Sequence, residues 1–128
     1  MSLNLHPCVL FVDDEISTLN SISRFLRREP YKMLFAESGI DALTILDKEK
    51  VDILVTDLRM PEMSGLELLA LVSDRFPRIL LLVVSATTEK KEKDEVLATI
   101  TVYDFISKPI NPHDFKEVLR KACDTVTI

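Results

Sequence analysis

Apolar residues along this chain of 128 residues follow two alternating patterns. In the first, short runs are apolar at nearly every position, and they predict buried strands at residues 8–13, 33–36, 52–57, 79–85 and 103–106. In the second, apolar residues recur every three or four positions, which predicts an amphipathic helix after each strand. Strands without polar alternation are buried on both faces, as in a parallel sheet whose two sides are covered by helices. The pattern therefore predicts a doubly wound α/β domain with a five-stranded parallel sheet.

Helix boundaries follow from breakers and capping residues. The first helix is predicted over residues 15–28, with Asp14 or Ser17 available to cap it and Pro30 to end it. The third helix is predicted over about residues 66–75. The last helix should begin with Asn111 as its cap and Pro112 at its first position, where proline is well tolerated.

The fourth helix contains the charged run 89–95, which we interpret as a solvated face. The apolar residues Val96, Leu97 and Ile100 follow this run in the same helix. The pair Thr101-Val102 then leads into the fifth strand with no glycine, so this turn has to be made without an easily adopted positive φ.

Composition narrows the function further. A net charge of −5 argues against a dedicated nucleic-acid surface. The most apolar run, residues 79–84, is far shorter than the roughly 20 residues that a membrane helix needs. With no cationic leader before an apolar segment, we expect a cytoplasmic protein without membrane contact. Cys8 and Cys123 lack metal-binding spacing and are expected to be buried, reduced thiols.

Charged residues stand where three of the predicted strands end. Asp13 and Asp14 close the first, Asp57 closes the third, and Lys108 follows the fifth. The carboxyl ends of parallel strands share one edge of the sheet, so these groups should converge on a single pocket. Clustered carboxylates repel one another unless a cation lies between them, which predicts a divalent metal. A phosphoryl group on one carboxylate, held by the metal and the lysine, would also explain why a lysine lies at this edge of the sheet.

Five segments in this order and spacing resemble the receiver domain of two-component response regulators, the CheY-like family, over about residues 7–124. They are Phe11-Val12-Asp13-Asp14-Glu15, Thr56-Asp57-Leu58-Arg59-Met60-Pro61, Gly65, Ser85-Ala86 and Lys108-Pro109. The resemblance implies a flavodoxin-like sheet of strand order 2-1-3-4-5. Residues 1–6 would be an N-terminal lead, and Met1-Ser2-Leu3 in it is consistent with a cloning remnant.

The resemblance also assigns roles at the pocket. Asp57 would accept a phosphoryl group from a sensor histidine kinase or a phosphotransfer protein. Asp13, Asp14, Asp57 and the backbone carbonyl of Arg59 would bind Mg²⁺, or Mn²⁺ in its place, and a sparse set of oxygen ligands suits magnesium. Lys108 would hold a phosphoryl oxygen, and the Lys108-Pro109 peptide is expected to be cis.

Signal output is a further implication of the resemblance. Ser85 would donate to the phosphoryl group, and Phe105 would be the aromatic switch residue that turns inward as Ser85 moves. An output domain or effector protein, or a second copy in a homodimer, would use the surface formed by the fourth helix, the fifth strand and the last helix. Thr101-Val102 replaces a Gly-Ala pair common in the family, and this departure resembles receivers attached to HD-GYP phosphodiesterases.

Two side-chain interpretations stay open. Arg59 either reaches over the pocket, where it affects phosphoryl lifetime or kinase contact, or it is a solvated loop residue. His6 and His113 lie away from predicted strand ends and are interpreted as surface residues.

Three other functions compete with a regulatory switch that catalyses only its own phosphorylation and dephosphorylation. One is a receiver-like interaction module that works without phosphorylation. Another is a magnesium-dependent phosphohydrolase of the haloacid dehalogenase type, which needs an aspartate where this chain has Arg59. The third, a flavin-binding protein, would need a phosphate loop of Ser, Thr and Gly in place of the acidic residues 13–15.

Overall fold

The computed structural model of this chain describes residues 6–86 and 90–126 and contains one five-stranded parallel sheet of order β2-β1-β3-β4-β5. The strands are β1 (Cys8–Val12), β2 (Lys32–Ala36), β3 (Ile53–Asp57), β4 (Leu80–Ser85) and β5 (Asp104–Ser107). The helices are α1 (Ile16–Leu26), α2 (Gly39–Lys48), α3 (Gly65–Arg75), α4 (Lys90–Thr99) and α5 (Pro112–Val126). The predicted doubly wound fold and strand order are confirmed.

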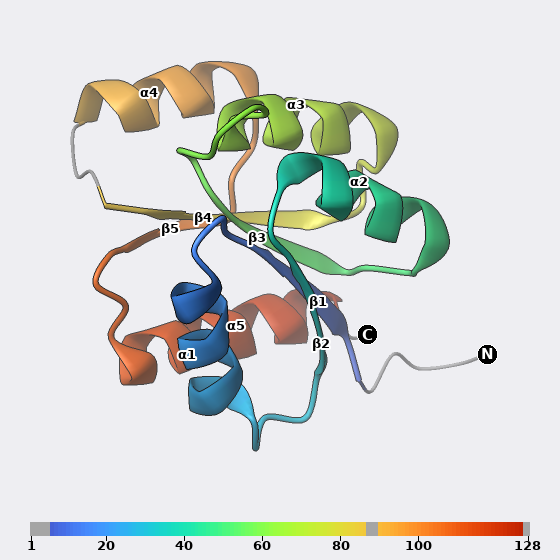
Figure 1. Cartoon of the computed structure of the whole chain (residues 1–128), viewed down its shortest axis with the longest axis vertical. Coiled ribbons are helices and arrows are strands. Elements are labelled where there is room, and N and C mark those ends of the chain that lie inside the picture. Colours follow the sequence, from blue (N-terminus) through green and yellow to red (C-terminus); the bar gives the residue numbers. More distant parts are fainter. Residues whose placement is uncertain (1–5, 87–89, 127–128) are drawn as a thin grey trace.

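Helices cover both faces of the sheet, with α1 and α5 on one face and α2, α3 and α4 on the other (Figure 1). Alternate residues of a strand enter different halves of the core. In β1, Val9 and Phe11 pack in the half under α1 and α5, whereas Leu10 and Val12 pack in the half under the other three helices. This two-sided burial is why the strands are apolar at almost every position.

The predicted cap of α1 is wrong. Glu15 occupies the N-cap position without a side-chain hydrogen bond, and Ser17 lies inside the helix. Asp13 instead accepts a hydrogen bond from the backbone N–H of Glu15 at 2.9 Å, just before the helix begins. The predicted cap of α5 is confirmed, because Asn111 accepts a hydrogen bond from the N–H of Asp114 at 3.1 Å.

The α4 region differs from the expectation in its charged run. Of the apolar residues that follow the run, Val96 and Ile100 are buried and Leu97 is 51% exposed. Within residues 90–95, Glu92 and Lys93 are partly buried rather than fully solvated, and Glu89 lies outside the described residues. The turn into β5 is made without a positive φ: among described residues other than glycine, only Glu62 has one.

The described helices include none that is long and apolar enough to span a membrane. Cys8 and Cys123 are buried, as expected. Burial raises the pKa of both thiols, that of Cys123 to about 11. Of the N-terminal lead, only His6 lies within the described part of the chain.

Candidate functional site

Two carboxylates and one ammonium group meet at the carboxyl edge of the sheet. The Nζ atom of Lys108 lies 2.9 Å from Oδ2 of Asp13 and 2.7 Å from Oδ2 of Asp57. Both aspartates are buried, and the lysine side chain is only 17% exposed. The convergence expected from the strand ends is therefore present in the structure.

Three strands deliver these groups. Asp13 follows β1, and its N–H donates to the carbonyl of Ala36 at the end of β2. Asp57 is the last residue of β3. Lys108 follows β5, its N–H donates to the carbonyl of Ser85 at 3.0 Å, and its peptide bond to Pro109 is cis. Each charged residue thus lies at or directly after the carboxyl end of a strand. The hydrogen bonds of the sheet fix its backbone, and its side chain extends into the pocket.

The loop after β3 folds tightly against the Asp57 backbone. The N–H of Gly65 donates to the carbonyl of Leu58 at 2.9 Å. A Cβ atom at Gly65 would overlap the backbone oxygen of Asp57, so only glycine fits this close approach. Within the loop, the N–H of Arg59 donates to Oδ1 of Asp57 at 3.1 Å. The carboxylate is therefore held from two sides, by this amide on Oδ1 and by Lys108 on Oδ2.

An oxygen-rich cluster suitable for a hard cation adjoins this arrangement. Asp13, Asp14 and Asp57 each offer a carboxylate oxygen, and these atoms lie within 4.8 Å of one another. The neighbouring pocket has a volume of about 530 Å³ and is open to solvent, which leaves room for the water ligands that Mg²⁺ retains. The donor set fits magnesium better than a thiophilic metal, because the cluster contains neither Cys nor His.

The pKa of Lys108 reflects two opposing influences. Burial alone would lower it, but hydrogen bonds and charge attraction from Asp57 and Asp13 outweigh the burial, and the net pKa is raised. Lys108 is therefore cationic at neutral pH and neutralises part of the acidic cluster.

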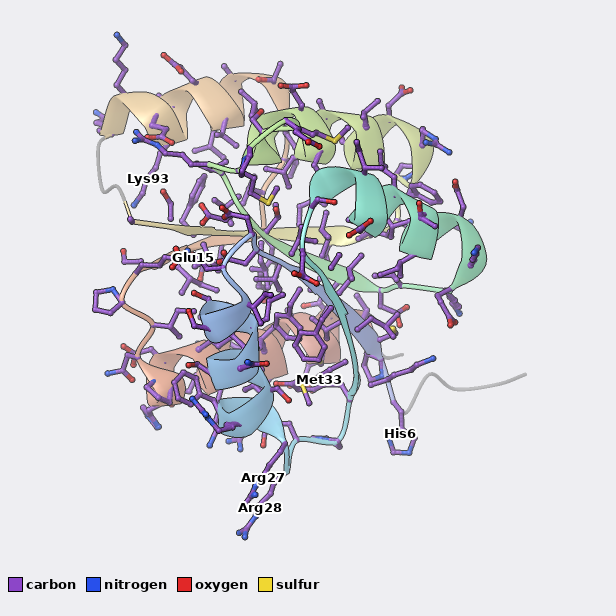
Figure 2. The ribbon with its side chains drawn as sticks, in the orientation of Figure 1. His6, Glu15, Arg27, Arg28, Met33 and Lys93 are labelled. Atoms are coloured by element: carbon purple, nitrogen blue, oxygen red, sulfur yellow. The ribbon has the colours of Figure 1, made fainter. Side chains whose placement is uncertain are left out.

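Ser85 and Phe105 lie beside the pocket on neighbouring strands. Ser85 is buried at the end of β4 and lines the charged pocket together with Ala86. Ser85 and Phe105 also line a second, small cavity of about 10 Å³. Phe105 is half-buried, and Nζ of Lys93 lies 5.6 Å from its ring centroid. Figure 2 shows Lys93 extending from α4 on the side that faces the sheet.

The Arg59 side chain points to α4. Its Nη2 atom lies 3.2 Å from Oε2 of Glu92, and the arginine side chain is 75% exposed while that of Glu92 is 22% exposed. Neither open interpretation of Arg59 included this partner. Sequence reasoning missed Glu92 because the two residues are 33 positions apart and nothing local distinguishes one glutamate in a charged run.

The two histidines lie away from the site. His6 is exposed at the start of the chain (Figure 2), where its ring Nδ1 lies 2.8 Å from the carbonyl of Pro30. His113 in α5 lies 3.2 Å from Glu117 and is also exposed. Both are surface residues, as predicted.

Comparison with known proteins agrees with the site. The sequence profile of the response regulator receiver domain matches residues 9–120. Transcriptional regulatory protein GlrR of Escherichia coli (strain K12) is 35% identical over 117 residues, which cover 91% of this chain but 25% of GlrR. Two-component response regulator ORR3 of Oryza sativa subsp. indica is 33% identical over 121 residues, covering 90% of this chain and 89% of ORR3. The chain thus spans about a quarter of the length of GlrR.

Solved structures give the same result. The signal receiver domain of an HD domain-containing protein from Pseudomonas fluorescens Pf-5 superimposes with a TM-score of 0.89 at 25% identity, covering 94% of this chain and 96% of that one. Chemotaxis response regulator CheY4 of Vibrio cholerae superimposes with a TM-score of 0.84 at 28% identity, covering 91% of this chain and 98% of that one.

The chain belongs to the response regulator receiver domain family. The class predicted from the sequence is confirmed: it is a regulatory domain of the two-component type, for which a phosphorylation-dependent signalling switch is the function. The roles of individual pocket residues stay predictions.

Proposed function

We propose that Asp57 is the phosphoacceptor of a signalling switch whose receiver unit spans residues 7–124. The observation that carries this proposal is the position of the Asp57 carboxylate. It lines an open pocket, with Lys108 Nζ at 2.7 Å and the acidic pair of Asp13 and Asp14 beside it. A nucleophilic carboxylate with a fixed cation next to it suits phosphoryl transfer, which depends mainly on positioning and on charge stabilisation.

The transfer starts from a phosphohistidine of a sensor kinase or a phosphotransfer protein. A carboxylate oxygen of Asp57 bonds to phosphorus while the P–N bond breaks, and the histidine nitrogen leaves with the electron pair. Attack of water on phosphorus later breaks the new P–O bond, releases inorganic phosphate and restores the carboxylate. No other covalent chemistry is required of the chain, so it is a switch that catalyses only these two steps.

Asp13, Asp14 and Asp57, with the backbone carbonyl of Arg59, would hold Mg²⁺ or Mn²⁺. The bound cation would offset the negative charge that accumulates when a phosphoryl group joins three carboxylates. Lys108 is already in the pocket and paired with Asp13 and Asp57. A phosphoryl oxygen would give its ammonium group a more highly charged acceptor, so Lys108 favours the phosphorylated state electrostatically.

Ser85 and Phe105 would transmit the change to the surface. A hydrogen bond from Ser85 to a phosphoryl oxygen would draw the end of β4 toward Asp57. The cavity that Ser85 and Phe105 share, about 10 Å³, is far too small for a phenyl ring. Inward rotation of Phe105 therefore requires displacement of Ser85 or of α4, and this requirement links the ring to the phosphorylation state.

Output is proposed for the surface of α4, β5 and α5, where an output domain, an effector protein or a second copy would bind in the cytoplasm. Leu97 and Tyr103 are exposed there and provide apolar contact area. An HD-GYP output stays a prediction: one similar structure belongs to an HD domain-containing protein, whereas GlrR is a transcriptional regulatory protein.

Phosphorylation at Asp57 can be tested with a small phosphodonor. Wild-type protein incubated with acetyl phosphate and Mg²⁺ should gain one phosphoryl group in an intact-mass measurement, and a chelator should prevent the gain. Asp57→Asn should gain none, whereas Asp41→Asn, which alters an exposed aspartate in α2, should behave as wild type. An equal gain by Asp57→Asn, or none by wild type, would overturn the proposal.

A further inference from the structure

Arg59 contacts both the phosphoacceptor and α4. Its backbone N–H donates to Asp57 Oδ1 at 3.1 Å, and its guanidinium pairs with Glu92 at 3.2 Å. The residue also borders two cavities: the pocket that contains Asp57, and a groove of about 360 Å³ beside α4 that Glu92 and Glu95 line. Arg59 therefore contacts two anionic groups, one through its backbone and one through its side chain, and the first changes charge when Asp57 is phosphorylated.

We propose that Glu92 competes with the phosphoryl group on Asp57 for the Arg59 guanidinium. This inference rests on the proposed function. In the unphosphorylated protein, Glu92 is a positioning residue that holds Arg59 on α4 and away from the pocket. After transfer, the guanidinium turns to the phosphoryl oxygens, and the first turn of α4 loses its link to the β3–α3 loop.

Charge and geometry support the exchange. A guanidinium matches carboxylate and phosphate groups equally well in shape. A phosphoryl group carries a charge of about −1.5 to −2, more than the single charge of Glu92. Because the Arg59 side chain is 75% exposed, few packing contacts have to break when it moves. The backbone of Arg59 is already hydrogen-bonded to Asp57, so only rotation about side-chain bonds is needed.

The competition has a bounded size. The Arg59 side chain is 75% exposed, and ion pairs with a solvent-exposed partner contribute little. Removing Glu92 should therefore strengthen binding of a phosphoryl group by at most about fivefold. The coupling is reciprocal: whatever Glu92 subtracts from phosphoryl binding, a phosphoryl group subtracts from the Arg59–Glu92 pair. An effect of this size changes the ratio between Arg59 paired with Glu92 and Arg59 paired with the phosphoryl group, and it leaves both states populated.

A double-mutant cycle on the full chain isolates this coupling. Beryllium trifluoride with Mg²⁺ serves as the phosphoryl mimic on Asp57, and its dissociation constant is measured for each variant. Glu92→Gln should bind the mimic about two- to fivefold more tightly than wild type. In the Arg59→Gln background, the same substitution should change binding far less, because the guanidinium is no longer there to be released.

Glu95→Gln is the matched control. It removes the same charge from the same helix and the same groove, and its side chain is exposed. A general electrostatic effect of α4 on the pocket would appear in this control and would be independent of Arg59. A coupling through Arg59 should appear for Glu92 and not for Glu95.

The guanidinium resonance of Arg59 in an NMR spectrum gives a second readout that a purely structural role of Glu92 would not move. It should shift when the mimic binds to wild type, and the free Glu92→Gln protein should lack the signature of the ion pair. If wild type binds the mimic but Glu92→Gln has the same effect in both Arg59 backgrounds, the proposed competition is wrong, while the proposed function of Asp57 is retained. If wild type does not bind the mimic, both proposals are wrong.

Discussion

Helices α4 and α5 lie on opposite faces of the sheet and are attached in different ways (Figure 1). α5 buries four residues, Phe115, Leu119, Ala122 and Cys123. The Phe115 ring lies 6.1 Å from that of Phe11 in an edge-to-face arrangement inside the core. By contrast, Val96 is the one buried residue among the described positions of α4. The first turns of α4 are held by polar contacts, from Glu92 to Arg59 and from Lys93 to Phe105.

This contrast identifies α5 as the helix that is anchored in the core and α4 as the helix that can move. Burial of apolar side chains holds α5 regardless of the charge at the phosphoacceptor. The contacts of α4 reach residues close to Asp57 and Ser85, and they are weak, because partly exposed charges gain little from pairing. Regions with few buried apolar contacts open at lower free energy than the core. α4 is therefore the helix whose position the chemistry of the pocket can change.

The largest difference should appear when one core residue of each helix is truncated. Phe115→Ala should lower the free energy of unfolding by about 3–5 kcal/mol, because it leaves a cavity among buried side chains. Val96→Ala removes two methyl groups and should cost about 1.5 kcal/mol. Urea denaturation of both variants measures the two values.

Equal costs for the two substitutions would contradict the division into anchor and movable helix. A loss of 5 kcal/mol can approach the total stability of a small domain. If Phe115→Ala does not fold, Phe115→Leu leaves a smaller cavity and keeps the ranking measurable. It should still cost more than Leu97→Ala, which truncates an exposed side chain of α4.

The pH dependence of the free energy of unfolding tests the burial of α5 through the thiol of Cys123. Burial raises its pKa from 9.0 to about 11, so between these values the thiol ionises in the unfolded chain but not in the folded one. The free energy of unfolding should therefore be unaffected by Cys123 below about pH 9 and should fall as the pH rises toward 11. In Cys123→Ala, stability measured by urea denaturation should fall less over the same interval.

The pKa of Cys8 is also raised by burial, so its thiol has the same sign of effect and is best removed in both proteins. On a Cys8→Ala background, a thiol reagent should modify Cys123 only as fast as α5 opens. A cysteine placed at the exposed position of Leu97 should react without opening. Similar reaction rates at the two positions would mean that Cys123 is accessible without opening of α5, which would contradict the firm attachment of α5.

The strands of the sheet could be predicted because the evidence for each strand lies within a short stretch of sequence. Each strand is a continuous apolar run, and Pro30, Pro77 and Pro112 mark helix boundaries. The predicted cap of α1 was wrong because Glu15, rather than Asp14 or Ser17, occupies the N-cap position, and Asp13, a residue of the site, fixes the backbone there by accepting the N–H of Glu15. Val96 and Ile100 share the buried face of the α4 region, whereas Leu97, next to Val96, points about a quarter turn away and is exposed.

The charged pocket was predictable for a different reason. Strand ends of a parallel sheet lie at one edge, so the places of Asp13, Asp57 and Lys108 in the chain imply their proximity. The partner of Arg59 could not be inferred in this way. Its contact with Glu92 depends on the path of the β3–α3 loop and on the rotation of α4 about its axis, and neither has a sequence signal.

The smallest effect concerns the contact between Lys93 and Phe105. Lys93→Ala should lower the free energy of unfolding by about 0.5–1 kcal/mol, because it removes an ammonium group 5.6 Å from the ring centroid at a partly exposed site. Lys91→Ala, an exposed lysine two residues earlier in α4, is the control and should cost less. In a Phe105→Leu background the two lysine substitutions should become equivalent. If Lys93→Ala keeps its full cost there, the lysine stabilises α4 without the ring, and α4 is not tied to the residue predicted to switch.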